Sequence, residues 1–294
     1  MGLDETAGAN GVVTQQAAHG SDGFRQGDVV ARAGALALQR YDFQTKKFLI
    51  LERSKNSMKK SEHPYRYSTE GAIIYETLGI RDTTYESGFL ELQRLLGDVR
   101  GRQFLDFGCG TGRSSEFLRS LGAVVHGVDH NLSMVEQAQK KTCDGMTFTL
   151  MEDVIPAGEK SMDGAISANV FIEIKTLDYM REACREVARV LKPDGVFVVM
   201  SANPAAFRSN FRNFSYSARE GVQSGERVIC TIKSQGQSFD IQDTFWQEND
   251  YRSALESSGF VVESVTYPRP DVLWDTDESK VPPFIVIKAR KIST

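Results

Sequence analysis

The chain has 294 residues, with 35 lysines and arginines against 39 aspartates and glutamates and a formal net charge of −4. This length is enough for one α/β enzyme domain with a large core and a lid. The mixed charges contain no basic stripe of the kind that binds nucleic acid, and no apolar run approaches the roughly 18 residues of a membrane span. A small molecule is therefore the expected partner.

The four cysteines lie scattered without a CxxC pair, and the four histidines lack the spacing of metal ligands. This usage is typical of reduced thiols and argues against a zinc site or a disulfide framework. The amino terminus has no secretory pattern, so the expected location is the cytoplasm. We expect no metal, and either a monomer or a homodimer.

The first 84 residues precede any nucleotide-binding pattern. Residues 1–28 are rich in Gly, Ala, Gln and Asp with few large apolar residues, which predicts disorder. Residues 29–41 have helical apolar spacing, and residues 46–53 contain a short apolar run that suits either a strand or a helix.

A predicted amphipathic helix at 85–96 leads into a buried strand at 104–107, which has an acid near its end and three glycines after it. The glycines let the backbone approach a ligand closely before a helix at 114–121. A dinucleotide fingerprint would need its third glycine where Arg113 stands, so NAD is disfavoured. A carboxylate here would repel a pyrophosphate but attract an ammonium group with a sulfonium nearby, and S-adenosylmethionine has both cations. The motif consists of Asp106, Gly108, Gly110 and Gly112.

Acids also follow the next two predicted strands. The strand at 123–128 ends in Asp129, where a nucleoside-binding βαβ unit has the acid that accepts both ribose hydroxyls. The strand at 146–151 is followed by Glu152 and Asp153, where an adenine amine needs an acceptor. Three acids thus follow three strands.

With these elements in place, residues 85–201 resemble the class I S-adenosylmethionine-dependent methyltransferases. Met162–Asn169 looks like the fourth strand of that family, and Glu186–Gly195 looks like its helix and turn into the fifth. The resemblance implies that the acid-and-glycine motif holds the methionine part and that Asp129 holds the ribose. It also implies that the adenine is held by Asp153 and the backbone of Val154, beside His130, where the family usually has an apolar residue.

The family resemblance carried by residues 85–201 further implies that residues 29–84 form a helical lid over the site. The alternative is that they cover a sheet edge.

Beyond a fifth strand at 195–200, four aromatic residues predict either a pocket wall or ordinary core. Two strands at 227–233 and 239–246 surround a glycine turn and predict a hairpin. A helix at 248–257 and strands at 260–266 and 284–289 complete the pattern. The aromatic residues are Phe207, Phe211, Phe214 and Tyr216.

The predicted fold class is therefore α/β: a Rossmann-like, seven-stranded, mostly parallel sheet with flanking helices, an N-terminal helical lid and an inserted β-hairpin. The catalytic domain spans residues 85–294, with an inserted cap at 203–247. The hairpin, Phe245-Trp246 and the Pro282-Pro283 step are similar to small-molecule methyltransferases of the toxoflavin synthase type. That similarity implies secondary metabolism and a nitrogen or oxygen acceptor.

Methyl transfer from a sulfonium is an in-line displacement that needs mainly alignment and the exclusion of water. Glu173, beyond the fourth strand and near Asn169, is the first candidate for an acid or base, although a solvated acid is the alternative. Tyr216 and Tyr65 come next. Tyr65 or Tyr67 is expected to meet Tyr216 across the cofactor, since a lid must keep water from the sulfonium.

Two other functions remain open at this point. The same fold permits an intramolecular reaction in which the amino nitrogen of S-adenosylmethionine attacks its own side chain, giving an azetidine amino acid and methylthioadenosine. The chain is alternatively a non-catalytic module that only binds S-adenosylmethionine. An assay without an added acceptor separates these alternatives from methyl transfer.

Overall fold

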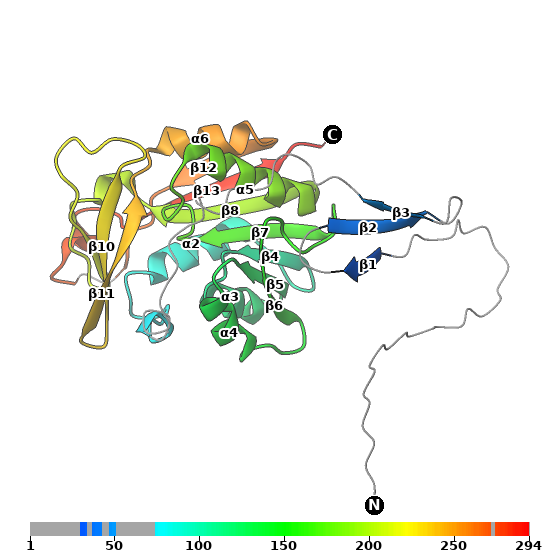
Figure 1. Ribbon diagram of the computed structural model, residues 1–294. Coiled ribbons are helices and arrows are strands. Elements are labelled where there is room, and N and C mark those ends of the chain that lie inside the picture. The colour runs from blue at the N-terminus through cyan, green and yellow to red at the C-terminus, as the bar shows by residue number, and fades with distance from the viewer. Residues whose placement is uncertain (1–29, 34–36, 43–46, 51–73, 272–273, 294) are drawn as a thin grey trace, which may run out of the picture. The chain divides into compact units, whose positions relative to one another are not determined.

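The computed structural model describes residues 30–33, 37–42, 47–50, 74–271 and 274–293 (Figure 1). The chain divides into two compact units, residues 1–55 and residues 56–294. The segment at 1–28, predicted to be disordered, lies outside the described residues.

The described part of the first unit is an antiparallel three-stranded sheet in the order β1-β2-β3. Its strands are β1 (Val30–Ala33), β2 (Ala37–Asp42) and β3 (Lys47–Ile50). The predicted helix over 29–41 is therefore wrong, and the run at 46–53 contributes a strand. These segments are too short to form a stable isolated helix. Pairing between strands, such as that of Val30 with Arg40, satisfies their backbone hydrogen bonds instead.

The second unit is built on a seven-stranded sheet in the order β12-β13-β8-β7-β4-β5-β6. β13 is antiparallel to both of its neighbours, and the remaining pairs are parallel. This is the predicted Rossmann-like sheet. Its strands are β4 (Gln103–Phe107), β5 (Val124–Asp129), β6 (Met146–Leu150), β7 (Met162–Ala168), β8 (Leu191–Ala202), β12 (Phe260–Thr266) and β13 (Phe284–Lys291).

Helices cover both faces of this sheet, and the sheet separates the hydrophobic core into two clusters. α5 and α6 lie on one side and α3 and α4 on the other (Figure 1). Side-chain caps start two of the helices: Asn131 accepts a hydrogen bond from the Ser133 N–H, and Thr176 accepts one from the Tyr179 N–H. The helices are α2 (Glu86–Leu96), α3 (Arg113–Ser120), α4 (Leu132–Gln139), α5 (Leu177–Val190) and α6 (Glu248–Glu256).

The predicted hairpin is present, and it belongs to a larger antiparallel sheet in the order β11-β10-β9. Gln235 and Gly236 have φ values of 48° and 77°, the conformation of a tight two-residue hairpin turn. The aromatic segment supplies the third strand, because Phe214 and Tyr216 alternate in a strand that pairs with β10. We call this sheet the cap. Its strands are β9 (Phe214–Tyr216), β10 (Arg227–Ser234) and β11 (Gln237–Thr244).

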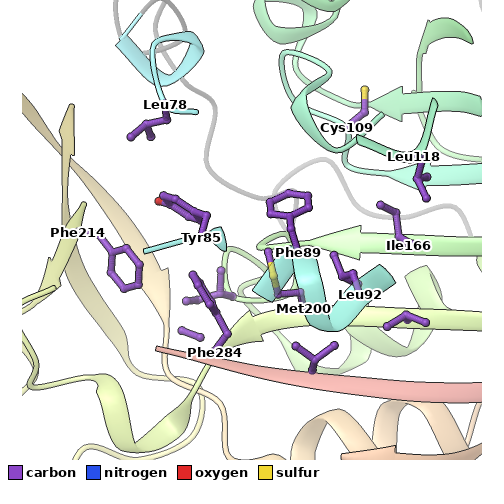
Figure 2. Packing of buried hydrophobic residues seen from close by; sticks show 14 of the residues in the cluster. Leu78, Tyr85, Phe89, Leu92, Cys109, Leu118, Ile166, Met200, Phe214 and Phe284 are labelled. Atoms are coloured by element: carbon purple, nitrogen blue, oxygen red, sulfur yellow. The ribbon is translucent and has the colours of Figure 1, made fainter. Parts of the chain in front are cut away.

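An aromatic cluster joins the cap to the central sheet (Figure 2). The ring of Tyr85, just before α2, lies 5.7 Å from that of Phe214 in β9 and 5.6 Å from that of Phe284 in β13. Close by, the Thr84 hydroxyl donates to buried Glu278 at 2.7 Å, and the Thr84 N–H donates to Asn213 at 2.9 Å. Apolar packing and buried hydrogen bonds therefore hold the cap against the sheet.

Packing in the sheet core predicts the effect of one small substitution. A Cβ at Gly164 in β7 would lie 2.4 Å from Cε1 of the buried Phe104 ring. We expect Gly164→Ala to lower the free energy of unfolding by about 1–3 kcal/mol, the usual effect of overpacking. Gly158→Ala is the control, because its Cβ would meet nothing nearer than 3.9 Å. Equal urea midpoints for the two variants would contradict this packing.

Candidate active site

The glycine loop between β4 and α3 has two faces. Gly108 has a φ of +74°, and a Cβ there would lie 2.2 Å from Cγ2 of Val170, so the loop packs directly against the turn after β7. A Cβ at Gly110, which has a φ of +54°, would meet nothing within 4 Å. The loop is therefore closed against the protein at Gly108 and open to a ligand at Gly110.

A cavity lies at the carboxyl ends of β4, β5 and β7, the position where doubly wound sheets bind ligands. We call it the nucleoside cavity. Six residues predicted from the sequence line it: Gly108, Gly110, Asp129, His130, Asn169 and Glu173.

Asp129 connects the glycine loop to the end of β5. Its Oδ2 accepts a hydrogen bond from the Gly110 N–H at 2.9 Å, and its Oδ1 accepts one from the Asn131 N–H at 2.8 Å. The carboxylate is thus held in place by backbone donors. Nδ1 of His130 also lies 3.5 Å from Oδ1. The carboxylate keeps lone pairs, on Oδ2 above all, that can accept a ribose hydroxyl.

Asp106 lies beneath the glycine loop and is fully buried. Its Oδ2 accepts hydrogen bonds from the Ser114 and Ser115 hydroxyls at 2.7 and 2.6 Å. Its Oδ1 has no hydrogen-bond partner among the described residues. Burial raises the pKa of this carboxyl to about 6, although the two serine hydroxyls oppose the shift. One buried oxygen thus remains for a donor such as an ammonium.

Three other predicted cofactor residues are not among those that line the cavity. A Cβ at Gly112 would lie 3.0 Å from the Phe148 ring, so this glycine serves packing between α3 and β6. Asp153 and the exposed Val154 follow β6, as the sequence predicted. Their proposed contact with the adenine stays a prediction.

A second cavity adjoins the first, and three residues border both: Tyr75, Asn169 and Glu173. We call it the aromatic cavity. The cap contributes Phe214, Tyr216, Cys230, Ile232, Ile241 and Asp243 to its walls. Tyr85, Ile172 and Phe284 complete the lining.

Tyr216 is buried in this wall and donates its hydroxyl hydrogen to Oδ2 of Asp243 at 2.9 Å. Burial, and after it the charge of Asp243, raises the pKa of the Tyr216 phenol well above its ordinary value. Burial also raises the pKa of the Asp243 carboxyl to about 7, partly offset by the Tyr216 hydrogen bond and by Arg227. Sequence reasoning singled out Tyr216 but missed its partner.

The sequence did contain a signal for Asp243. Phe239, Ile241 and Phe245 occupy alternate positions, so Asp243 stands in an otherwise apolar row that faces the cap interior. A charged residue in such a row is rarely buried without a specific role.

Arg113 is a second site residue that sequence reasoning missed. Its Nη2 donates to the Tyr75 hydroxyl at 2.9 Å, and its guanidinium carbon lies 4.4 Å from the centre of the Tyr85 ring. It thereby ties both tyrosines to the start of α3. Tyr65 and Tyr67 lie outside the described residues, whereas Tyr75, from the same predicted lid segment, lines the aromatic cavity together with Tyr216.

A wider and more open groove runs between residues 76–81, α2 and α3. Glu76, Arg113 and Lys141 line it, but the open face of Gly110 and the carboxylate of Asp129 do not. Despite its size, this groove lacks the features that suit a nucleoside.

Comparisons with known proteins agree with this geometry. The sequence model of a family described as a methyltransferase domain matches residues 105–199. An uncharacterized protein of Methanocaldococcus jannaschii is 31% identical over 188 residues, which are 62% of this chain and 72% of that protein. The chain belongs to the class I S-adenosylmethionine-dependent methyltransferases. The methyltransferase is also 25% identical to the N-demethylindolmycin N-methyltransferase of Streptomyces griseus, over 63% of this chain and 78% of that enzyme.

Solved structures share the fold of this methyltransferase. An S-adenosylmethionine-dependent methyltransferase from Mesorhizobium loti has a TM-score of 0.52 at 21% identity, covering 70% of this chain and 98% of that chain. The CcbJ methyltransferase from Streptomyces caelestis has a TM-score of 0.54 at 20% identity, covering 76% and 96%. The cofactor of the methyltransferase is S-adenosylmethionine.

Within the described residues, no helix has the length and apolar character needed to cross a membrane. The same residues contain no group of three histidine, cysteine, aspartate or glutamate side chains suited to a metal ion.

The position of Asp129 leads to a binding prediction. We expect Asp129→Ala to weaken S-adenosylmethionine binding by about 1.5–3 kcal/mol, because hydrogen bonds to a charged acceptor are lost. Calorimetry at neutral pH measures the difference. Asp144→Ala, which removes an exposed acid outside the cavity, is the control and should bind normally. Equal affinity of the Asp129 variant and the wild type would exclude a ribose contact.

Proposed function

We propose that this methyltransferase acts on a nitrogen or oxygen of a small molecule of secondary metabolism. The observation that carries the proposal is the pair of adjoining cavities that share Tyr75, Asn169 and Glu173. One cavity has the features of a nucleoside site, and the other is walled mainly by apolar and aromatic side chains. A methyl group passing between them would cross at the shared residues.

The nucleoside cavity fits S-adenosylmethionine on two counts: Gly110 presents an open backbone face, and Asp129 carries spare lone pairs. Asp106 does not line the cavity, but its buried Oδ1 lacks a partner among the described residues. When bound, the cofactor supplies an electrophilic methyl group on a sulfonium. The protein then has to align the acceptor and exclude water, for which apolar walls at the boundary are suited.

The lining of the aromatic cavity supports a small acceptor. Its walls come from the cap, from Tyr85 and from β13, and buried side chains such as Phe214 and Phe284 form part of them. The relative from Streptomyces griseus, named for N-methylation of demethylindolmycin, supports a nitrogen acceptor in secondary metabolism.

We assign Glu173 and Tyr216 different roles. Glu173 borders both cavities, which supports a role for its carboxylate in taking a proton from the attacking group. Tyr216 already donates to Asp243, and its raised pKa keeps the phenol protonated near neutral pH. Tyr216 therefore positions a neighbouring group.

The two alternatives left open by the sequence account for less of the geometry of the described residues. Intramolecular use of the sulfonium needs no second cavity beside the nucleoside cavity, yet the structure contains one. A binding module would need no carboxylate at the boundary between the two.

A labelling experiment tests this function. S-adenosylmethionine with a labelled methyl group is incubated with the enzyme and, separately, with the small-molecule and macromolecular fractions of a cell extract. We expect S-adenosylhomocysteine and a labelled small molecule from the first fraction only. Label in the macromolecular fraction, or methylthioadenosine formed without any acceptor, would contradict the proposal.

The assignment of Glu173 leads to a kinetic prediction. With the identified acceptor, Glu173→Gln should lower kcat by roughly 10²- to 10⁴-fold, the usual contribution of a general base, while cofactor affinity changes little. Glu256→Gln, at the exposed end of α6, is the matched control and should keep normal kinetics. An unchanged kcat in the Glu173 variant would exclude a catalytic role for that carboxylate.

A further inference from the structure

Asp243 is a buried carboxylate with one oxygen unused. It is 2% exposed, and it lines the aromatic cavity but not the nucleoside cavity. Its Oδ2 accepts the Tyr216 hydroxyl, and the Cys230 thiol is a further, weak donor to the carboxylate. Its Oδ1 has no hydrogen-bond partner at ordinary distance among the described residues. A buried carboxylate oxygen without a hydrogen-bond donor lowers the stability of the protein, and a ligand that supplies a donor removes this cost.

The guanidinium of Arg227 does not supply the missing hydrogen bond to Oδ1 of Asp243. Arg227 directs its guanidinium to the Thr244 hydroxyl and the Gln242 carbonyl, and one N–H approaches the Glu173 carbonyl at 3.4 Å. The charged side chains that line the aromatic cavity are the carboxylates of Asp243 and Glu173. With both ionised, the cavity favours a cation over a neutral or anionic molecule.

We propose that Asp243, held by Tyr216, anchors a cationic amine on the methyl acceptor, so that the acceptor is a small basic molecule with a flat apolar body. This inference rests on the proposed function and narrows its substrate class. Asp243 determines specificity at a distance from the reacting atoms.

The two carboxylates then have separate tasks. Asp243 lies in the aromatic cavity alone, so an ammonium bound there sits away from the cofactor. Glu173 lies at the boundary, where a second nitrogen or oxygen of the same molecule would meet the methyl group. Tyr85, Phe214 and Phe284 also line the aromatic cavity and would supply apolar contacts to the body of the acceptor. Recognition at two points aligns the nucleophile.

Binding of the amine should depend on pH. Asp243 must lose its proton to attract a cation, and its pKa of about 7 places that step near neutrality. Amine binding should therefore strengthen as the pH rises through about 7. The phenols and the thiol nearby have raised pKa values and stay protonated there. The groups around Asp243 are Tyr216 from β9, Arg227 and Cys230 from β10, Glu173 after β7, and Tyr75 and Tyr85 before β4.

The test compares two probes with the same apolar body, 2-phenylethylamine and 2-phenylethanol. Calorimetry measures their binding to the full chain saturated with S-adenosylhomocysteine, so that the nucleoside cavity is occupied. The wild type should prefer the amine by roughly 10- to 100-fold at pH 8, as a charge-assisted hydrogen bond provides, and by less at pH 6.

Asp243→Asn should abolish this preference while binding S-adenosylhomocysteine normally, which shows that the variant is folded. Asp240→Asn makes the same change on the exposed side of β11 and should keep the preference. Glu173→Gln should also keep most of it. Equal binding of the two probes, no amine binding, a preference independent of pH, or a preference that survives in Asp243→Asn would each overturn the proposal.

Failure of the role proposed for Asp243 can be distinguished from failure of the proposed methyl transfer. If the wild type methylates a neutral small molecule and shows no amine preference, methyl transfer stands and only the role of Asp243 falls. If no acceptor is methylated at all, the proposed function fails whatever the probes show.

Discussion

The contact between Gly108 and Val170 is the constraint on which the site depends. No larger residue fits at position 108, because a Cβ would lie 2.2 Å from the valine side chain. The glycine loop after β4 is thereby held against the turn after β7. That turn carries Asn169 and Glu173, which border both cavities. A local packing contact thus brings the cofactor region and the proposed acceptor region together.

The cap adds the second cavity to this arrangement. Tyr85 packs against Phe214 and Phe284, and Arg113 ties Tyr85 and Tyr75 to the start of α3. Burial of a charged group strengthens its electrostatic interactions, because water screens them less. Asp106 and Asp243 both have raised pKa values from burial, so the protein holds two carboxylates at an energetic disadvantage in or beside its cavities. Such groups are typical of sites built for a charged ligand.

The sequence predicted the parts of the site that depend on local pattern. Asp129 could be found because a short apolar strand leads directly to it, and Gly236 marked the hairpin turn. Asp243 and Arg113 were missed because their partners, Tyr216 and Tyr75, are distant in sequence and meet only through the fold. The segment at 29–41 was misjudged because short apolar runs suit a helix or a strand, and pairing between strands decided the outcome.

The central claim is that the cofactor and the acceptor meet at Tyr75, Asn169 and Glu173. A crystal structure of the full chain with S-adenosylhomocysteine tests it most directly. We predict that the ribose hydroxyls contact Asp129 and that the thioether sulfur lies at the boundary of the two cavities, facing the aromatic cavity. A sulfur that instead faces the open groove between residues 76–81, α2 and α3 would contradict the account.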